Sequence, residues 1–182
     1  MDKDKSYKDI LGFLLITLIA VSFFYPIFNS GYLVHLDNPT HHFEYTFLAK
    51  HILPVHNWIN GWCMQDFLGY PILLYRPQFG LWLAIILNKL FFVSLLNSYK
   101  IMVLFSLVLI CCSMYFLVTP RFGRKAAICA ALILMLQKDV YFDKILAGMW
   151  ENYLAIGVLL IFFALLNKYA NYLSLKKAIL LG

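Results

Sequence analysis

One polar and aromatic stretch, residues 29–77, stands out in a chain that is otherwise mostly apolar. It contains all five histidines and three of the nine acidic residues, Asp37, Glu44 and Asp66. Carboxylates and imidazoles are the side chains that most often move protons in enzymes, because their pKa values can be tuned toward neutral pH. If the protein catalyses a reaction, we expect this stretch to hold the reacting groups.

Asp37 is the leading candidate for a catalytic base, because a carboxylate can accept the proton of an attacking hydroxyl group. Its neighbours Asn38 and Pro39 are typical of the start of a helix, with Asn as the cap and Pro at the first helical position. Capping of that helix is therefore the alternative role of Asp37.

Glu151 is the second catalytic candidate, and it could assist the binding of a donor substrate or a metal. It lies about one turn into an apolar run, where an unpaired charge is costly and is usually functional or paired. An ion pair with Lys138 or Lys144 at the membrane interface is the alternative.

Two cations in or near the same stretch, Lys50 and Arg76, could bind a phosphate group, since a guanidinium offers two parallel hydrogen bonds to phosphate oxygens. Contact with lipid headgroups is the alternative for both. A divalent metal is a further possibility, because imidazole and carboxylate both suit such metals. The residues that could form this metal site, whose spacing matches no defined motif, are His35, Asp37, His41 and His42.

Composition indicates an integral membrane protein: 63% of the 182 residues are hydrophobic and only 13% are charged, about half the charge of a soluble domain. The net charge of +6 comes from short basic clusters between apolar runs, which is typical of membrane topology signals. We therefore expect a lipid bilayer, and no nucleic acid, as the partner.

Four apolar runs are expected to cross the membrane: residues 10–28, 101–119, 126–137 and 147–166. The third is short for a span. A fifth run, residues 79–96, approaches spanning length but contains Asn88 and Lys89.

The distribution of basic residues decides whether residues 79–96 cross. If they do not cross, nine of the fifteen Lys and Arg residues fall in 28 residues on one side, and six fall in 88 residues on the other. The positive-inside rule favours this arrangement. The sequence thus predicts a multi-pass protein of the cell membrane with a cytoplasmic N-terminus, four spans and a large first exterior loop, in which residues 79–96 form an interfacial or re-entrant helix.

A surface helix is expected in that loop over residues 39–53, which Pro54 would end. Helical spacing places Tyr45, Leu48 and Ile52 on one face and His42, Thr46 and Lys50 on another. The aromatic residues expected to anchor the loop at the membrane interface are Trp58, Trp62 and Tyr70.

The order of several short motifs resembles a known family. The motifs are Asp37-x-Pro39-x-His41, then Trp58 and Trp62, Gly69-Tyr70-Pro71, Tyr75-x-Pro77, Ser98-Tyr99-Lys100, Ser113-Met114-Tyr115, Arg121-Phe122-Gly123-Arg124 and Gly148-x-x-Glu151. In this order they resemble the N-terminal part of the bacterial and archaeal membrane proteins labelled "6-pyruvoyl-tetrahydropterin synthase-related", within the GT-C glycosyltransferase superfamily. The label does not imply pterin chemistry.

The resemblance implies an all-α, GT-C-like helical bundle and an inverting transferase that takes a sugar from a polyprenyl-phosphate carrier on the outer face of the membrane. It implies a catalytic acid just after the first helix, which here is Asp37, and surface helices between the first two spans. The substrate-binding residues are then expected to be Arg76, Lys50, His41 and Tyr75. Metal use varies in the superfamily, so a divalent metal is a possible cofactor only.

Two departures from the family pattern matter. The usual Tyr-Pro-Pro reads Tyr75-Arg76-Pro77, and the later helices that serve acceptor recognition are not in this sequence. A new apolar run begins at Ala178, so residues 1–182 are expected to be a single transmembrane domain from the N-terminal part of a longer protein, and inactive alone. The alternative function is a non-catalytic membrane component, such as a subunit that binds or transports a lipid carrier.

Overall fold

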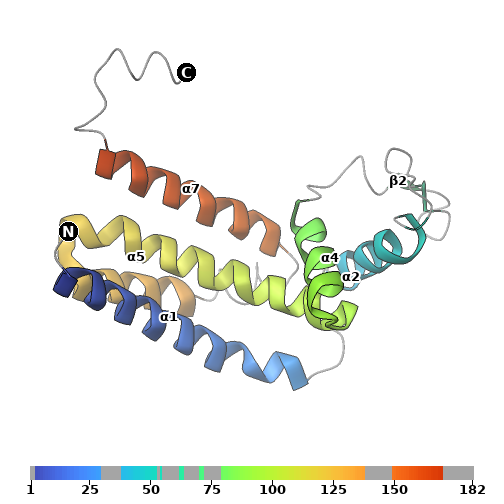
Figure 1. Cartoon of the computed structure of the whole chain (residues 1–182), viewed down its shortest axis with the longest axis horizontal. Helices are drawn as coiled ribbons and strands as arrows, with labels where there is room; N and C mark the ends of the chain where they lie inside the picture. The colour runs from blue at the N-terminus through green and yellow to red at the C-terminus, as the bar shows by residue number, and fades with distance from the viewer. Residues whose placement is uncertain are drawn as a thin grey trace, which may run out of the picture.

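The computed structural model describes residues 3–29, 38–52, 54, 62–63, 70–71, 79–137 and 149–169, and this part of the chain is almost entirely helical (Figure 1). The helices are α1 (Lys3–Asn29), α2 (Asn38–Phe47), the π-helical segment η1 (Leu48–Ile52), α4 (Phe79–Phe91), α5 (Leu95–Leu136) and α7 (Trp150–Tyr169). Two very short strands, β1 (Trp62–Cys63) and β2 (Tyr70–Pro71), pair antiparallel, with Trp62 opposite Pro71.

Within the described ranges, three helices are long and apolar enough to cross a membrane: Asp9–Asn29, Leu95–Leu136 and Trp150–Asn167. Even the shortest, at 18 residues, is about 27 Å long at 1.5 Å per residue, close to the thickness of the hydrocarbon core. The expected class, an all-α membrane protein, is confirmed at this level for the described residues.

The outward faces of these helices are apolar as well, as lipid contact requires. Leu18 of α1 is 65% exposed, Ile133 of α5 is 70% exposed and Val158 of α7 is 55% exposed. Hydroxyl groups inside α5 bond to the backbone of their own helix: Ser113 Oγ donates to the carbonyl of Leu109. Such internal bonds remove the cost of placing a hydroxyl among apolar groups.

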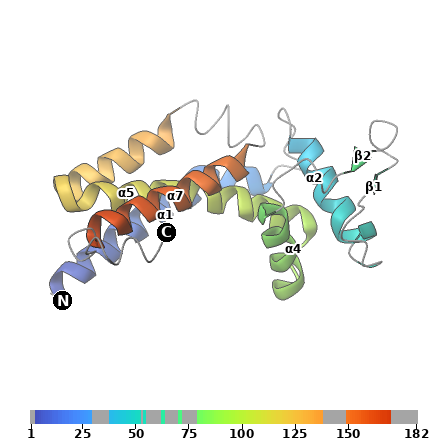
Figure 2. The same ribbon diagram turned by 90° about the horizontal axis from the view of Figure 1, so that it is seen from above.

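The helix α4 lies across one end of the bundle, beside α2 (Figures 1 and 2). Its 13 residues span only about 20 Å, less than the roughly 30 Å of a bilayer's hydrocarbon core. The predicted segment 79–96 was too long: α4 ends at Phe91, Phe92 adopts a positive φ of 53°, and α5 starts at Leu95. Ser94 caps α5, its side chain accepting a hydrogen bond from the backbone N–H of Asn97 at 3.2 Å.

The helix α5 is broken at Gly123, whose φ of 80° and ψ of 169° are not helical. A straight helix of 42 residues would be about 63 Å long, roughly twice the hydrocarbon thickness. The chain instead reverses direction at Gly123, and residues 124–136 run back along the bundle (Figures 1 and 2). The prediction of a turn at residues 121–124 is therefore confirmed. The predicted apolar run 126–137 lies in the returning helix.

The helices α1 and α5 pack antiparallel. Lys100, near the start of α5, donates from Nζ to the carbonyl of Ile27, near the end of α1, at 2.8 Å. At the opposite end, Asp9 Oδ1 accepts hydrogen bonds from Arg124 Nε at 2.6 Å and from the Tyr115 hydroxyl at 3.3 Å. The two helices are thus tied together at both ends.

The helix α7 runs parallel to the first part of α5. Trp150, at the start of α7, donates from Nε1 to the Tyr99 hydroxyl at 3.2 Å. Arg121, more than 20 residues further along α5, donates from Nη2 to Asn167 Oδ1, at the far end of α7, at 3.2 Å. The chain must therefore return along the length of the bundle between Arg121 and Trp150.

Candidate functional site

Polar and aromatic side chains gather at the end of the bundle where α2 and α4 meet the first turns of α5 and α7. We call them the polar cluster: His41, His42, Glu44, Tyr45, Ser98, Tyr99, Lys100, Trp150 and Glu151. The helices α2 and α4 lie beyond the last turn of α1, next to the start of α5 (Figure 2). The cluster therefore combines segments that are more than 100 residues apart in the sequence.

One face of α2 supplies the first group of these residues. Residues three and four positions apart share a face of a helix, and here His41 is 6% exposed, Glu44 is 1% exposed, and Tyr45 and Leu48 are fully buried. The three residues expected on one face, Tyr45, Leu48 and Ile52, are all buried. The helix is not uniform, however, because the backbone widens to a π-helix at Leu48–Ile52.

Tyr45 joins α2 to both α4 and α5. Its hydroxyl donates to the carbonyl of Ala84 in α4 at 3.2 Å and lies 2.8 Å from Oγ of Ser98 in α5. Burial raises the pKa of Tyr45 to about 12, although the bond with Ser98 opposes this shift. The phenol thus stays protonated at any physiological pH and serves as a fixed hydrogen-bonding group.

Tyr99 extends the cluster to α7. Its ring stacks on Tyr45 with centroids 6.3 Å apart, and His42 and Trp150 each meet it edge-on with centroids 5.8 Å away. Trp150 is fully buried. Edge-on and offset-stacked contacts of this kind stabilise by about 0.5–1.5 kcal/mol each beyond simple burial, so the rings fix the relative positions of α2, α5 and α7.

Glu151 follows Trp150 in the first turn of α7, and its carboxylate faces α4. A Cβ atom added at Gly80 would lie 3.0 Å from Glu151 Oε1 and 2.5 Å from Trp150 Cη2. Only glycine leaves room for such a close approach between α4 and α7. The small residue at position 80 therefore lets Trp150 and Glu151 pack closely against α4.

His41 and Glu44 form a buried pair, with Nδ1 of the histidine 3.8 Å from Oε2 of the glutamate. A carboxylate taken out of water loses several kcal/mol of solvation, so a compensating partner is needed. His42 lies next to this pair in the sequence but has a different environment. Burial, followed by the positive charges of Lys50 and Lys100, lowers the pKa of His42 below its ordinary value of 6.5.

Lys100 is only 1% exposed, and its ammonium group lies at the C-terminal end of α1. The last carbonyls of a helix lack partners within the helix and carry a partial negative charge. Lys100 satisfies one of these carbonyls and places a positive charge beside the cluster. This differs from the prediction, which counted Lys100 as part of the exterior loop.

The predicted site residues are only partly described by the structure. Asp37, Tyr75 and Arg76 lie outside the described residues, as does His35. His41 and Glu151 both belong to the polar cluster. Lys50 is exposed on η1, and its positive charge helps to lower the pKa of His42.

Sequence reasoning missed the contributions of Glu44, Lys100, Tyr99 and Trp150. For Glu44, a signal existed: it stands three residues after His41, which places both side chains on one helical face. Lys100 gave no such signal, because a lysine that precedes an uncharged run can lie at the membrane surface as readily as in the interior. The pairing of Tyr99 with Trp150 depends on the parallel packing of α5 and α7, which no local pattern encodes.

The arrangement offers a buried carboxylate, a neutral imidazole and a fixed cation within one set of packed helices. Such groups can move protons and bind anionic substrates, because charges act strongly where water is excluded. In the part of the chain that the structure describes, no group of three or more His, Cys, Asp or Glu side chains could hold a metal ion. Comparisons with models of protein families, with curated proteins and with solved structures found no match to this chain.

Proposed function

We propose that the chain is part of a GT-C-like membrane glycosyltransferase that moves a sugar from a polyprenyl-phosphate carrier to an acceptor on the outer face of the membrane. The observation that carries the proposal is the burial of Glu44 with His41 on a helix that packs across one end of the bundle. Burying an ionisable pair costs solvation energy, so such a pair is more often kept where it binds or reacts with something.

The proposed topology has four spans, with the N-terminus in the cytoplasm and the polar cluster at the outer face. The parallel packing of α5 and α7 supports a third span at the returning residues 124–136, because the chain must come back before α7 begins. The basic residues at the other end of the bundle support the orientation; in the described part of the chain they are Lys3, Lys5, Lys8, Arg121, Arg124, Lys125 and Lys168. The helices α2 and α4 then lie at the outer interface, where a lipid-linked donor would arrive.

In this proposal Asp37, the residue before the first residue of α2, takes the proton of the acceptor hydroxyl as the new glycosidic bond forms. The bond between the anomeric carbon and the phosphate oxygen breaks, and polyprenyl phosphate leaves. Glu151 assists donor binding from α7. The residues that would contact the donor are Lys50, Arg76, His41 and Tyr75.

The test uses intact purified protein and measures polyprenyl phosphate released from a polyprenyl-phosphate sugar. Asp37→Asn preserves size and most capping ability, because Asn caps helices about as well as Asp. It cannot accept a proton, so transfer should fall by about 10²-fold or more, whereas Asp66→Asn, a matched change in the same stretch, should leave it unchanged. Binding of the donor should be kept in both variants.

Two outcomes would overturn parts of the proposal. Normal transfer by Asp37→Asn would exclude this residue as the base, and donor binding without any turnover by the parent would favour a non-catalytic, carrier-binding component. A further variant, His41→Gln, tests the metal alternative. Losing a ligand would lower activity in a way that added divalent metal partly restores.

A further inference from the structure

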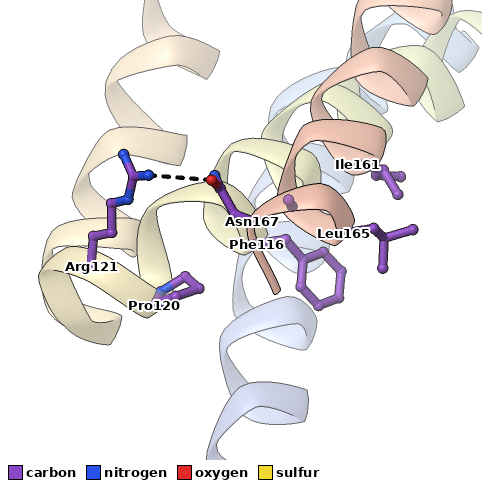
Figure 3. Close-up of a pocket in the computed structure, with 7 residues that line it drawn as sticks. Phe116, Pro120, Arg121, Ile161, Leu165 and Asn167 are labelled. Carbon is purple, nitrogen blue, oxygen red and sulfur yellow. Dashed lines mark hydrogen bonds between the residues drawn. The ribbon is translucent and has the colours of Figure 1, made fainter. Parts of the chain in front are cut away.

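A hollow of about 360 Å³ lies between α5 and α7, at the end of the bundle opposite the polar cluster (Figure 3). Its lining residues are Phe116, Pro120, Arg121, Ile161, Ala164, Leu165 and Asn167. All but Arg121 and Asn167 are apolar, and these two stand together at one edge (Figure 3). The hollow thus has an apolar wall and a polar rim.

The sequence explains why α5 and α7 leave space at this point. Ala164 has a short side chain that cannot fill the gap between the helices. Pro120 has no N–H group, and its ring prevents a regular hydrogen bond to the carbonyl of Phe116 one turn earlier. Phe116 and Leu165 are each 47% exposed, so the apolar wall is open to whatever surrounds the bundle.

Arg121 contacts a neutral partner rather than a carboxylate among the described residues. Its Nη2 donates to the neutral side-chain oxygen of Asn167, and in the described part of the chain it has no ion pair with a carboxylate. Arg124, three residues later, differs: its Nε lies 2.6 Å from Asp9 Oδ1. A guanidinium has five N–H donors, so the contact with Asn167 leaves most of those of Arg121 for another acceptor.

We propose that this hollow binds one anionic phospholipid, with its phosphate on Arg121 and the first part of an acyl chain against Phe116, Ile161 and Leu165. Charge complementarity selects the headgroup. Arg121, held in place by the neutral amide of Asn167, stands at the end of an apolar groove, just as a phosphate stands at the end of an apolar lipid chain. The site lies at the opposite end of α5 and α7 from the polar cluster, so it is separate from the proposed donor site.

The test measures binding of dioleoyl phosphatidylglycerol to the purified full chain by native mass spectrometry and by the shift of the unfolding temperature. Dioleoyl phosphatidylcholine and soluble glycerol 3-phosphate are the comparison probes. The parent should bind phosphatidylglycerol at least about tenfold more tightly than phosphatidylcholine, because a hydrogen bond to a charged group is involved. Glycerol 3-phosphate should not compete at equal concentration, since it has no chain for the apolar wall.

Three variants localise the site. Arg121→Gln should weaken phosphatidylglycerol binding about tenfold, and Arg121→Lys should retain part of it. Lys125→Gln is the matched control, because Lys125 is an exposed cation four residues later that does not line the hollow. Ala164→Phe keeps every charge but fills the groove, so it should abolish binding while the helical circular dichroism spectrum stays unchanged.

Several results would overturn the proposal. Equal losses from Arg121→Gln and Lys125→Gln would indicate diffuse attraction to a basic surface. Equal binding of the two lipids would exclude recognition of the negative charge, and strong competition by glycerol 3-phosphate would indicate a simple phosphate site. Absence of phosphatidylglycerol binding by the parent, together with destabilisation by Ala164→Phe, would show that another protein segment fills the groove.

Discussion

Gly80→Ala is expected to destabilise the protein although alanine favours helices. The added methyl carbon would lie 2.5 Å from Trp150 Cη2 and 2.7 Å from Cζ3, whereas ordinary contacts begin near 3.4 Å. The indole must therefore move by about 1 Å, and it is fully buried, so it has no free space to enter. Its hydrogen bond to Tyr99, already 3.2 Å long, would be broken by that movement.

The magnitude follows from three contributions. Overpacking of a filled core costs about 1–3 kcal/mol, and the lost hydrogen bond about 0.5–1.5 kcal/mol. The better helix propensity of alanine offsets about 1 kcal/mol. The free energy of unfolding should fall by roughly 1–3 kcal/mol, measured by reversible denaturation with SDS in mixed micelles and followed by circular dichroism.

A double-mutant cycle tests the reasoning. Trp150→Phe removes the two ring atoms nearest to the added methyl group, so in that background Gly80→Ala should be neutral or slightly stabilising. The two substitutions must then be non-additive by at least 1 kcal/mol, on the order of the coupling between residues in contact. Additive effects would refute the close packing of α4 against Trp150.

Three further predictions concern single sites. Tyr45→Phe should lower the free energy of unfolding by about 1–2 kcal/mol, because two buried hydrogen bonds of the hydroxyl are lost, whereas Tyr7→Phe, at a side chain 62% exposed, should change nothing measurable. Because the pKa of His42 is lowered in the folded protein, this imidazole binds a proton more readily in the unfolded chain than in the folded one. Stability should therefore be full above pH 6.5 and fall as the pH drops from 6.5 toward the lowered value; His42→Gln should remove this slope, and an unchanged slope would contradict the assignment. On intact cells, a membrane-impermeant thiol reagent should label Cys63 and spare the cysteine of Phe122→Cys, and equal labelling would refute the proposed orientation.

Local patterns in the sequence predicted much of the helical framework. The apolar run at residues 10–28 follows from composition, and the shared face of Tyr45, Leu48 and Ile52 follows from helical spacing, because both depend on residues close together in the chain. The start of α5 at Leu95 was missed, although Ser94 is a good N-cap residue. The predicted span began at residue 101 because Lys100 was taken as a sign of the membrane surface.

The polar cluster was less predictable because its contacts join distant segments. Nothing near Lys100 indicates that its ammonium group binds the carbonyl of Ile27, 73 residues earlier. Gly80 gives no local sign that it makes room for Trp150. Residues 29–77 supply α2 and η1 to the cluster, whereas the contribution of α5 and α7 depends on tertiary packing.

In the proposed four-span topology, the parallel course of α5 and α7 also sets a demand on the surrounding bilayer. From Tyr99 to Arg121 the helix rises about 33 Å, whereas the returning helix, residues 124–136, covers only about 20 Å. A hydrophobic segment shorter than the membrane is accommodated by local thinning, at a fraction of a kcal/mol per ångström of mismatch. The protein should therefore fold more completely in lipids with shorter acyl chains, and the acyl-chain length of the host membrane would help to determine how much folded protein accumulates there.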